Sequence, residues 1–595
     1  MSLKAEQRYC HSLKKFVGRV TLPTHTGIAD KGLVILLAGI QRRWKVSVAV
    51  YLSKKRSEEV KKQKVKAASV GANVVGVTSD MGADNLALWK SKEVTGSKNK
   101  DVVSSFPNPA RENLNVYVLP DAVHLMKAAK SMMESNKIIT LPEDIVEEEG
   151  LPSANVNYNH IDDLFQHEGG NELKVAFRLR DYNIHCNKQF KKMNVGTTKA
   201  VLCHRTGVGL KLLAEEMNDP TYETTGWFII LLNTFFELVL CRHRGLAVSK
   251  FNEDVYLKTV QLVSGVADIF HRMKVGQDGD YKPAQRGMRV LCKSLLGLIE
   301  YFLGERKYAY LILGRFTSDC IENLFSCVRL SQPIPNAAMF LQCLKDITLA
   351  QISVAVKGSS YDYEGNGPLP VDFLQEARQR AHDRALTKFS ESVQELMENA
   401  IRPHQESDYQ MLSPWEKMVV YDMAGSVIAA ILKSNSTVCE ICIGATKWKA
   451  DTPHPAALIT RMKKFTLLRS EENAMLQICV SDEVFHAILT AEISFRLYRE
   501  RTLKFEYADV KQFFVENLMY VWGNSLIPSC HELGRKILTT YFDARLKEFG
   551  KLKREVADKE NQASRKPPTV NKSSKSVAKH ALADSVTVSS SIVRL

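Results

Sequence analysis

The sequence predicts an α/β core close to the amino terminus, a large all-helical insertion within that core, and a mostly helical carboxy-terminal region. Three observations lead to this prediction. Short apolar runs typical of strands occur before residue 155, and helical apolar spacing dominates after it. Two acidic motifs that look like parts of one site are centred on Asp80 and Glu322, 242 positions apart. Because one βα unit is far shorter than that, a helical domain has to lie between them.

Apolar runs in the first 120 residues predict strands. Leu33–Ile40 and Val46–Leu52 are separated by Gln41-Arg42-Arg43-Trp44-Lys45, which predicts a hairpin or strand pair. Residues 116–119, Val-Tyr-Val-Leu, form another short run that ends at Pro120. Beyond residue 155, segments with helical spacing include 226–241, 255–272 and 288–303.

The first acidic motif, VTSDMGADN at 77–85, predicts a buried strand that presents a carboxylate at its tip. The apolar run Val74–Val77 leads to Asp80, and a Gly-Ala-Asp-Asn turn follows. An Asp after a strand is also a common turn former, so the pattern alone leaves a structural role open.

The second acidic motif, TSDCIENLFSCVR at 317–329, predicts a helix that begins near Thr317 or Ser318. Asp319 and Glu322 lie three apart beside an apolar stripe, which consists of Ile321, Leu324, Phe325 and Val328. Carboxylates are hard oxygen ligands for Mg²⁺, and a two-metal site stabilises both oxygens of a phosphoryl displacement. A solvated Glu on an amphipathic helix is the other interpretation.

Size and charge bound the class of protein. A chain of 595 residues with 45% hydrophobic content is expected to form several packed domains. The formal charge of +15 suits a polyanionic partner such as DNA, although other basic proteins share that balance. Twelve scattered cysteines without a secretory signal predict reduced thiols in the nucleus or cytosol. We expect no membrane partner, because residues 227–241 are too short for a span and contain Asn233 and Glu237.

Three further segments have a composition of their own. Residues 53–66 carry seven Lys or Arg, which suits either a DNA path or a solvated helix face. Residues 357–370 are rich in Gly and Pro and predict a linker or loop. From residue 551 onwards, ten Lys or Arg stand against four Asp or Glu, which predicts a disordered tail that binds phosphates, acts as a nuclear address or only solubilises the chain.

In their order and spacing, these motifs resemble the P-element family of DNA transposases, in particular its P-like branch in arthropod genomes. The stretches that match the family's first strands, its strand-helix motif, its insertion domain and its carboxy-terminal region are 16–52, LPDAVHLMK at 119–127, KKMNV at 191–195, 227–242 and YDMAGSVIAAIL at 421–432. The resemblance implies an RNase H-like core interrupted by a helical GTP-binding insertion domain. The implied domains are the first part of the core, the insertion, the closing helices of the core, a helical region and a basic tail, at 1–150, 151–310, 311–350, 351–550 and 551–595.

The resemblance also implies a catalytic triad of Asp, Asp and Glu that uses Mg²⁺. Asp80 matches the second acid and Glu322 the third, and both are the implied metal ligands. The first acid has no counterpart, because Met1-Ser2-Leu3-Lys4 resembles the residues that directly follow it. The family's amino-terminal THAP zinc finger is likewise not seen. We therefore expect this chain to cleave or join DNA poorly. Asp121 is a runner-up ligand only, and His124 is expected to be a buried, hydrogen-bonded residue at the strand-helix junction.

Nucleotide binding depends on positions in the implied insertion domain. Asp319 matches an acid that accepts from guanine, and Val195 matches an apolar contact. Glu237 and Leu240 stand where the family has an Asp and an Asn, and Leu240 cannot make the amide hydrogen bonds. Two interpretations of 227–242 stay open, a GTP-binding helix and a plain core helix, and the second is favoured.

A structural zinc site is a further candidate. Cys439 and Cys442 have the CxxC spacing of zinc ligands, and Cys530 and His531 follow much later. Without a nearby second pair, buried thiols are the favoured interpretation.

The leading hypothesis is a P-element-like DNA transposase that performs Mg²⁺-dependent cut-and-paste transposition and is catalytically incomplete in this chain. Its implied partners are transposon ends, target DNA and further copies of itself, and its implied location is the nucleus. The alternative is a domesticated, non-catalytic DNA-binding or assembly protein derived from a transposase. A nucleotide-binding regulatory protein is the third hypothesis.

Overall fold

The structure is a computed structural model of the chain. It describes all residues except 11–14, 22–25, 42–44, 54–72, 109–110, 112, 186–193, 332, 355–400, 403, 435–438, 450–451, 463–478, 503–509, 523–531, 565–590 and 595. The chain divides into two compact units. Unit 1 comprises Met1–Phe165, Arg178–Ser359 and Val570–Leu595, and unit 2 comprises Gln166–Phe177 and Ser360–Thr569.

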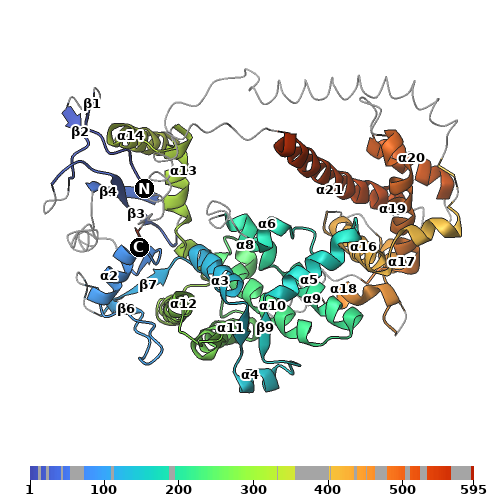
Figure 1. The fold of residues 1–595 in the computed structure, drawn as a ribbon, viewed down its shortest axis with the longest axis horizontal. Coiled ribbons are helices and arrows are strands. Elements are labelled where there is room, and N and C mark those ends of the chain that lie inside the picture. The colour runs from blue at the N-terminus through green and yellow to red at the C-terminus, as the bar shows by residue number, and fades with distance from the viewer. Residues whose placement is uncertain are drawn as a thin grey trace. The chain divides into compact units, whose positions relative to one another are not determined.

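Unit 1 contains a six-stranded mixed sheet with the order β4-β3-β11-β5-β7-β6 (Figure 1). β3 and β4 form the predicted antiparallel hairpin, and β5 and β7 pair in parallel. β11 lies between β3 and β5, parallel to the first and antiparallel to the second. The strand bounds are Lys31–Ala38 for β3, Lys45–Ser53 for β4, Gly76–Ser79 for β5, Ser105–Pro107 for β6, Asn115–Pro120 for β7 and Ser591–Arg594 for β11.

β3 is buried on both faces, which explains its continuous apolar sequence KGLVILLA. Alternate residues enter two different cores. Val34 and Leu36 pack with the apolar stripe of α13 (Asp319–Ser331) and with α14 (Ala337–Val354), whereas Ile35 packs with Val77 of β5. The predicted stripe of the second acidic motif therefore faces the sheet.

The other face of the sheet is covered by helices that follow the parallel strands. α2 (Ala83–Ser91) follows β5 and α3 (Ala122–Asn136) follows β7. α12 (Pro283–Ile299) packs against β7, and its Ser294 Oγ donates to the carbonyl oxygen of Val118 at 2.5 Å. The sheet is thus covered by α13 and α14 on one face and by α2, α3 and α12 on the other.

The helices predicted between the two acidic motifs are present. α10 (Thr221–Leu240), α11 (Glu253–Arg272) and α12 match them, and α12 continues into a π-helical turn at Glu300–Glu305. α10 packs along α9 (His204–Met217) through Gly207 and Gly226. A Cβ atom on either glycine would lie 2.7–2.8 Å from the other's carbonyl oxygen, so only glycine permits this approach.

Among the described residues, α10 is the one helix long and apolar enough to suit a membrane span. Phe228, Leu232, Phe235 and Val239 on it are almost fully enclosed within unit 1. This burial agrees with the interpretation of 227–242 as a core helix.

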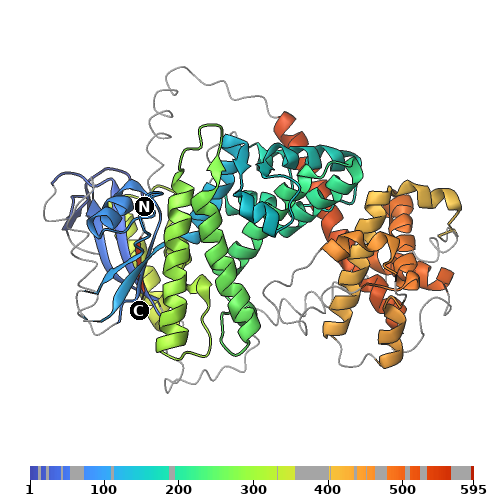
Figure 2. The same cartoon turned by 90° about the horizontal axis from the view of Figure 1, so that it is seen from below.

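Unit 2 combines the segment Gln166–Phe177 with helices near the carboxy terminus, drawn orange and red in Figure 2. Its helices include α16 (Pro414–Ser434), α19 (Asp482–Thr502), α20 (Val510–Trp522) and α21 (Leu533–Ser564). Arg545 is 1% exposed and pairs with both Glu492 and Glu172. Glu416 accepts hydrogen bonds from the backbone N–H groups of Glu172 and Leu173. Because buried charges require partners, this network fixes the segment among the helices.

The expectation of a disordered tail is partly wrong, and two other segments with a distinctive composition lie outside the described residues. The basic tail expected to be disordered from 551 instead continues α21 to Ser564, and Ser591–Arg594 forms β11. Lys, Arg, Glu and Ala in 551–564 are good helix formers, and Lys551 pairs with Glu548 one turn away. The basic segment 53–66, apart from Ser53, lies in residues 54–72, outside the described part of the chain. The Gly- and Pro-rich segment 357–370 lies in residues 355–400 and is also outside the described part.

Removal of β11 is predicted to loosen the centre of the sheet. In a chain truncated after residue 590, backbone groups of β3 and β5 lose hydrogen bonds worth about 1 kcal/mol each. Amide hydrogen exchange should accelerate at least about tenfold in residues 35–38 and 76–79. Helices α16 and α19 of unit 2 are the internal control and should be unaffected. Unchanged protection of β3 and β5 would show that β11 does not hold the sheet together.

Candidate active site

Asp80 lies directly after β5 and is oriented by its own turn. Its Oδ1 accepts hydrogen bonds from the Gly82 N–H at 3.0 Å and from the Asn85 amide at 2.7 Å. A Cβ atom on Gly82 would lie 2.9 Å from that oxygen, so glycine keeps the turn compact. Within the described residues, Oδ2 of Asp80 accepts no hydrogen bond. One carboxylate oxygen is thus held and the other is available to a ligand.

Asp121 joins two distant parts of the chain. It caps α3, where its Oδ2 accepts from the His124 N–H at 3.2 Å, and its Oδ1 accepts from the Ser318 N–H at 2.8 Å. Its own N–H donates to the carbonyl oxygen of Ser79 at 2.9 Å. Asp121 is 1% exposed. Since both of its oxygens are engaged, Asp121 has a structural role here.

A second long-range hydrogen bond supports the first. The Thr78 hydroxyl on β5 donates to the carbonyl oxygen of Phe316 at 2.8 Å, across 238 positions in the sequence. Ser318 is bound to Asp121 across 197 positions. Together these bonds hold the start of α13 at the carboxyl ends of β5 and β7, which is where Asp80 lies.

Asp80 and Glu322 consequently share one electrostatic environment. Both carboxylates, together with Asp121, act to raise the pKa of Lys127 on α3, although burial lowers that pKa overall. Both also act on the amino group of Met1, which donates to the carbonyl oxygen of Gly32 at 2.8 Å. Both acids that the sequence singled out therefore lie within electrostatic reach of Lys127 and of the Met1 amino group.

Burial is the main influence on Asp80. It raises the pKa of the carboxyl group, and the neighbouring Asp121 carboxylate adds to this effect. The hydrogen bonds from Gly82 and Asn85 and the nearby His124 act in the opposite direction. An ionised Asp80 is therefore costly in the free protein, and a bound cation would offset that cost.

The polar groups of this region suit a divalent cation. Ser79 Oγ and His124 Nδ1 are buried atoms without a hydrogen-bond partner, and His124 Nδ1 lies 3.6 Å from Asp121 Oδ2. Mg²⁺ prefers carboxylate and water oxygens and often takes only one or two carboxylates from a protein. Asp80 and Glu322 would be those ligands. No set of three or more His, Cys, Asp or Glu that could hold a metal is found among the described residues.

The expectation for His124 needs correction. Its side chain is 31% exposed, and the described residues offer no hydrogen bond to its Nδ1. The reason is that the neighbouring Asp121 carboxylate accepts from backbone N–H groups, and its Oδ2 lies 3.6 Å from His124 Nδ1, beyond hydrogen-bond distance.

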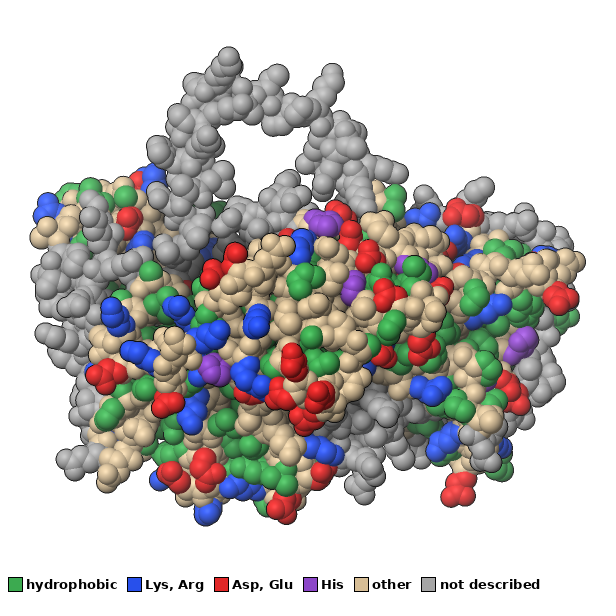
Figure 3. Space-filling model, turned by 60° about the horizontal axis from the view of Figure 1, so that its bottom comes forward, with side chains coloured by type: hydrophobic (Ala, Val, Ile, Leu, Met, Phe, Trp, Pro, Cys, Tyr) green, Lys and Arg blue, Asp and Glu red, His purple; other side chains and the backbone are tan. Residues whose placement is uncertain are grey.

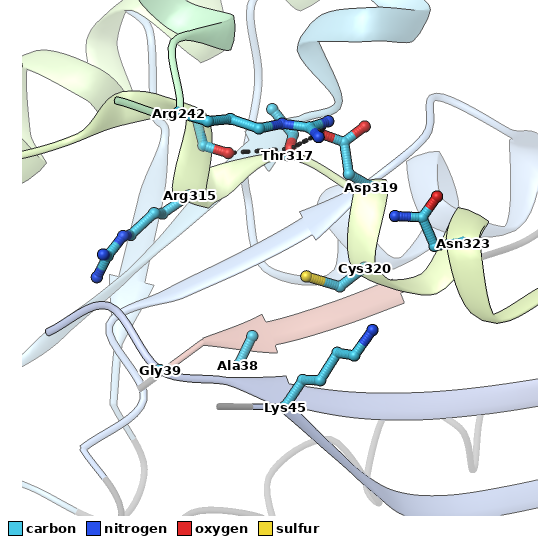
Figure 4. A pocket seen from close by; sticks show the side chains of 10 residues that line it. Ala38, Gly39, Lys45, Arg242, Arg315, Thr317, Asp319, Cys320 and Asn323 are labelled. Atoms are coloured by element: carbon cyan, nitrogen blue, oxygen red, sulfur yellow. Dashed lines mark hydrogen bonds and ion pairs between the residues drawn. The ribbon is translucent and has the colours of Figure 1, made fainter. Parts of the chain in front are cut away.

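Asp319 lies three residues before Glu322 on α13 and lines a cavity of about 320 Å³ that we call the α13 cavity (Figure 4). Its carboxylate pairs with Arg242 and accepts from the Thr317 hydroxyl at 2.7 Å. Val195, the first residue of α8 (Val195–Val201), and the exposed Glu237 do not line this cavity. The lining residues are Ala38, Gly39, Lys45, Arg242, Gly314, Arg315, Thr317, Asp319, Cys320 and Asn323. GTP binding by Asp319, Val195 and Glu237 stays a prediction.

The zinc candidates lie in unit 2. Cys439 precedes α17 (Glu440–Thr446) as its cap, and Cys442 is buried within that helix. Neither cysteine forms a disulfide, and no group of three metal ligands that would include them is found among the described residues. A zinc site at Cys439 and Cys442 also stays a prediction.

Sequence reasoning missed two roles at this site. Asp121 connects α3 to the start of α13 through its two carboxylate oxygens, and Lys127 is the buried cation near the acids. The Pro-Asp pair before an apolar helical pattern at 120–121 is a helix-start signal, which could have identified the cap. Nothing in the local sequence could have shown that Asp121 also binds Ser318, because that contact depends on the tertiary structure.

Three comparisons relate this chain to known proteins by domain, by sequence and by fold. A family model described as the TNP-like, RNase H N-terminal domain matches residues 1–92. The transposable element P transposase of Drosophila melanogaster is 22% identical over 270 residues, which are 44% of this chain and 33% of that relative. The solved Drosophila P element transposase strand transfer complex matches with a TM-score of 0.50 and 18% identity, over 59% of this chain and 75% of that one.

The fold is thus a mixed α/β core with helical regions, similar to that of the solved transposase, and residues 1–92 match an RNase H-like domain. The chain is related to the P-element-type DNA transposases, as the motifs predicted. It spans a third of the length of the curated relative that it matches.

Substitution of Asp80 should reveal the cost of its charge. Burial raises the pKa of Asp80 in the folded protein above its value in the unfolded chain. The protein therefore loses stability as the pH rises through the interval between these two pKa values, and the whole loss remains at neutral pH. Asp80→Asn keeps an oxygen for Gly82 and Asn85 and should raise stability at pH 7 by about 1 kcal/mol, a gain typical of neutralising a functional site.

Thermal unfolding of unit 1 followed by circular dichroism measures this effect. The gain should shrink as the pH falls and vanish below the ordinary Asp pKa of about 3.9, where the carboxyl is protonated in the folded and the unfolded chain alike. Asp101→Asn, at an exposed position, is the matched control and should change little. Destabilisation by Asp80→Asn at pH 7 would refute the assignment of Asp80 as a strained acid.

Proposed function

We propose that this chain is the core of a P-element-type transposase that binds DNA and positions it at Asp80 and Glu322. The observation that supports the proposal is that hydrogen bonds hold the start of α13 at the ends of β5 and β7, where the carboxylates of Asp80 and Glu322 both act on Lys127. Carboxylates in this arrangement suit phosphodiester chemistry with Mg²⁺, which when bound stabilises charge on a phosphate.

The chain's own residues have separable tasks in this proposal. Asp80 Oδ2 and Glu322 would hold the metal, and Gly82 and Asn85 orient Asp80. Asp121 positions α13 and does not touch the metal. Lys127 supplies positive charge beside the acids while no metal is bound.

We propose further that chemistry in this chain is weak. Two carboxylates leave a pair of divalent ions with few ligands and poorly screened repulsion. The absence of a third metal-binding side chain among the described residues supports this view. Target DNA and transposon ends belong to the same proposal, supported by the charge of +15 and by the similarity to a transposase. A homo-oligomeric assembly and a nuclear location are proposed from the resemblance of the motifs alone.

GTP is the less favoured cofactor. The Asp319 carboxylate, which would accept from guanine, is already engaged by Arg242 and Thr317. A nucleotide would have to displace that ion pair before it could bind there. This favours the interpretation in which the family's nucleotide function has been lost.

The second candidate function is a domesticated DNA-binding or assembly protein without chemistry. Lys127 among the three acids favours it, because an ammonium group can replace part of the charge that a metal would supply. Both candidates require DNA binding, and they differ in cleavage.

One experiment separates them. Binding of a labelled DNA duplex is measured by fluorescence anisotropy, and nicking of a supercoiled plasmid is measured with Mg²⁺ or Mn²⁺. We expect submicromolar-to-micromolar binding at low salt and nicking no faster than that of the Asp80→Asn, Glu322→Gln double variant. Nicking clearly above that control would show a competent enzyme. A chain that does not bind DNA at all would contradict both candidates.

A further inference from the structure

The α13 cavity carries an unusual excess of cations. Three of its lining residues, Lys45, Arg242 and Arg315, are basic, and Asp319 is the one acid. Arg242 already pairs with that acid. Neither Lys45 nor Arg315 has a carboxylate partner among the described residues, so the cavity retains a surplus of two positive charges.

The cations are held in place by a close backbone approach. Gly314 donates its N–H to the carbonyl oxygen of Cys241 at 3.0 Å, and a Cβ atom at Gly314 would lie 2.1 Å from that oxygen. This contact places Arg242, which follows α10, beside Arg315 of the short turn Leu313–Phe316. Arg315 is further fixed because it donates to the carbonyl oxygen of Ile40. The cavity is therefore built by rigid segments.

The lining offers hydrogen-bond donors beyond those that Arg242 and Arg315 already use. Figure 4 shows the Lys45 side chain rising from the strand β4 towards α13, where Asn323 and Cys320 face the cavity. An ammonium group, a guanidinium group and an amide can all donate hydrogen bonds, and Arg suits phosphate oxygens through its fork of N–H groups. The complement of this lining is an anion rich in acceptor oxygens.

The position of the cavity indicates the source of that anion. Asp319 and Asn323 of the cavity lie within one helical turn of Glu322. Side chains three or four residues apart on a helix are neighbours about 5–6 Å apart, so one nucleic-acid strand can reach both the cavity and Glu322. On the face drawn in Figure 3, several Lys and Arg side chains lie near one another in the left part, and Asp and Glu are mixed with them elsewhere.

We propose that the α13 cavity binds a backbone phosphate of the DNA strand whose neighbouring phosphates lie at Asp80 and Glu322. The proposal rests on the proposed function, since it requires DNA as the partner. Lys45 and Arg315 are the phosphate contacts, Asn323 adds a neutral donor, and Arg242 stays paired with Asp319.

Substitution of Lys45 tests the contact. Lys45 is exposed and makes no ion pair with a described residue, so Lys45→Gln should fold normally. DNA affinity at low salt should fall about three- to tenfold, and the slope of log K against log salt should decrease by about 1. Lys293→Gln, at an exposed site on α12, is the matched control and should leave the slope unchanged. An unchanged slope in Lys45→Gln, while the wild type binds DNA, would overturn the proposal.

Cysteine protection gives an independent readout in the unmodified chain. Cys320 lines the cavity, whereas the exposed Cys327 lies two turns further along the same helix and outside the lining. Alkylation by iodoacetamide, followed by peptide mass spectrometry, should be slowed at Cys320 by a DNA duplex, with a much smaller effect at Cys327. Equal protection of both thiols, or of neither, would contradict a phosphate in the cavity.

A third arm separates DNA from small anions. Inorganic phosphate and GTP are added at the concentration of DNA phosphates in place of the duplex. Protection of Cys320 by either one, but not by DNA, would mean that the cavity is a small-anion site and would overturn the proposal. Failure of the wild type to bind DNA at all would instead reject the proposed function, so the two failures are distinguishable.

Discussion

The carboxylate of Asp121 is the constraint on which the rest of the site depends. A single buried side chain caps α3 and accepts the N–H of Ser318, so it joins the end of β7 to the start of α13. Charge-assisted hydrogen bonds of this kind are roughly twice as strong as neutral ones. With the Thr78 bond to Phe316, this tie closes a core that a large helical segment interrupts in sequence.

The candidate functional residues depend on that tie. Asp80 and Glu322 both act on the pKa of Lys127, and burial keeps the pKa of Asp80 raised and its ionised form costly. Asp319, Cys320 and Asn323 of α13 line the basic α13 cavity. One helix thus carries, within a single turn, an acid that suits a cation and part of a lining that suits an anion, as a site for a metal and a phosphate chain requires.

Local patterns predicted the parts whose chemistry is local. The hairpin of β3 and β4, the tip position of Asp80 and the apolar stripe of α13 all follow from periodicity over a few residues. Three features could not be predicted in that way. Ser318 as the partner of Asp121, the place of β11 between β3 and β5, and the fixing of Gln166–Phe177 in unit 2 depend on contacts between segments hundreds of residues apart.

The most direct test of this account is the affinity for Mn²⁺, measured by titration calorimetry, in two variants at position 121. Asp121→Asn retains a carbonyl oxygen for the Ser318 N–H, whereas Asp121→Ala retains none. If Asp121 acts only by positioning α13, the Asn variant should bind Mn²⁺ within about threefold of the wild type, and the Ala variant should lose at least tenfold, as distant positioning residues do. Equal loss in both variants would make Asp121 a metal ligand, and wild-type affinity in the Ala variant would contradict the central role of the tie.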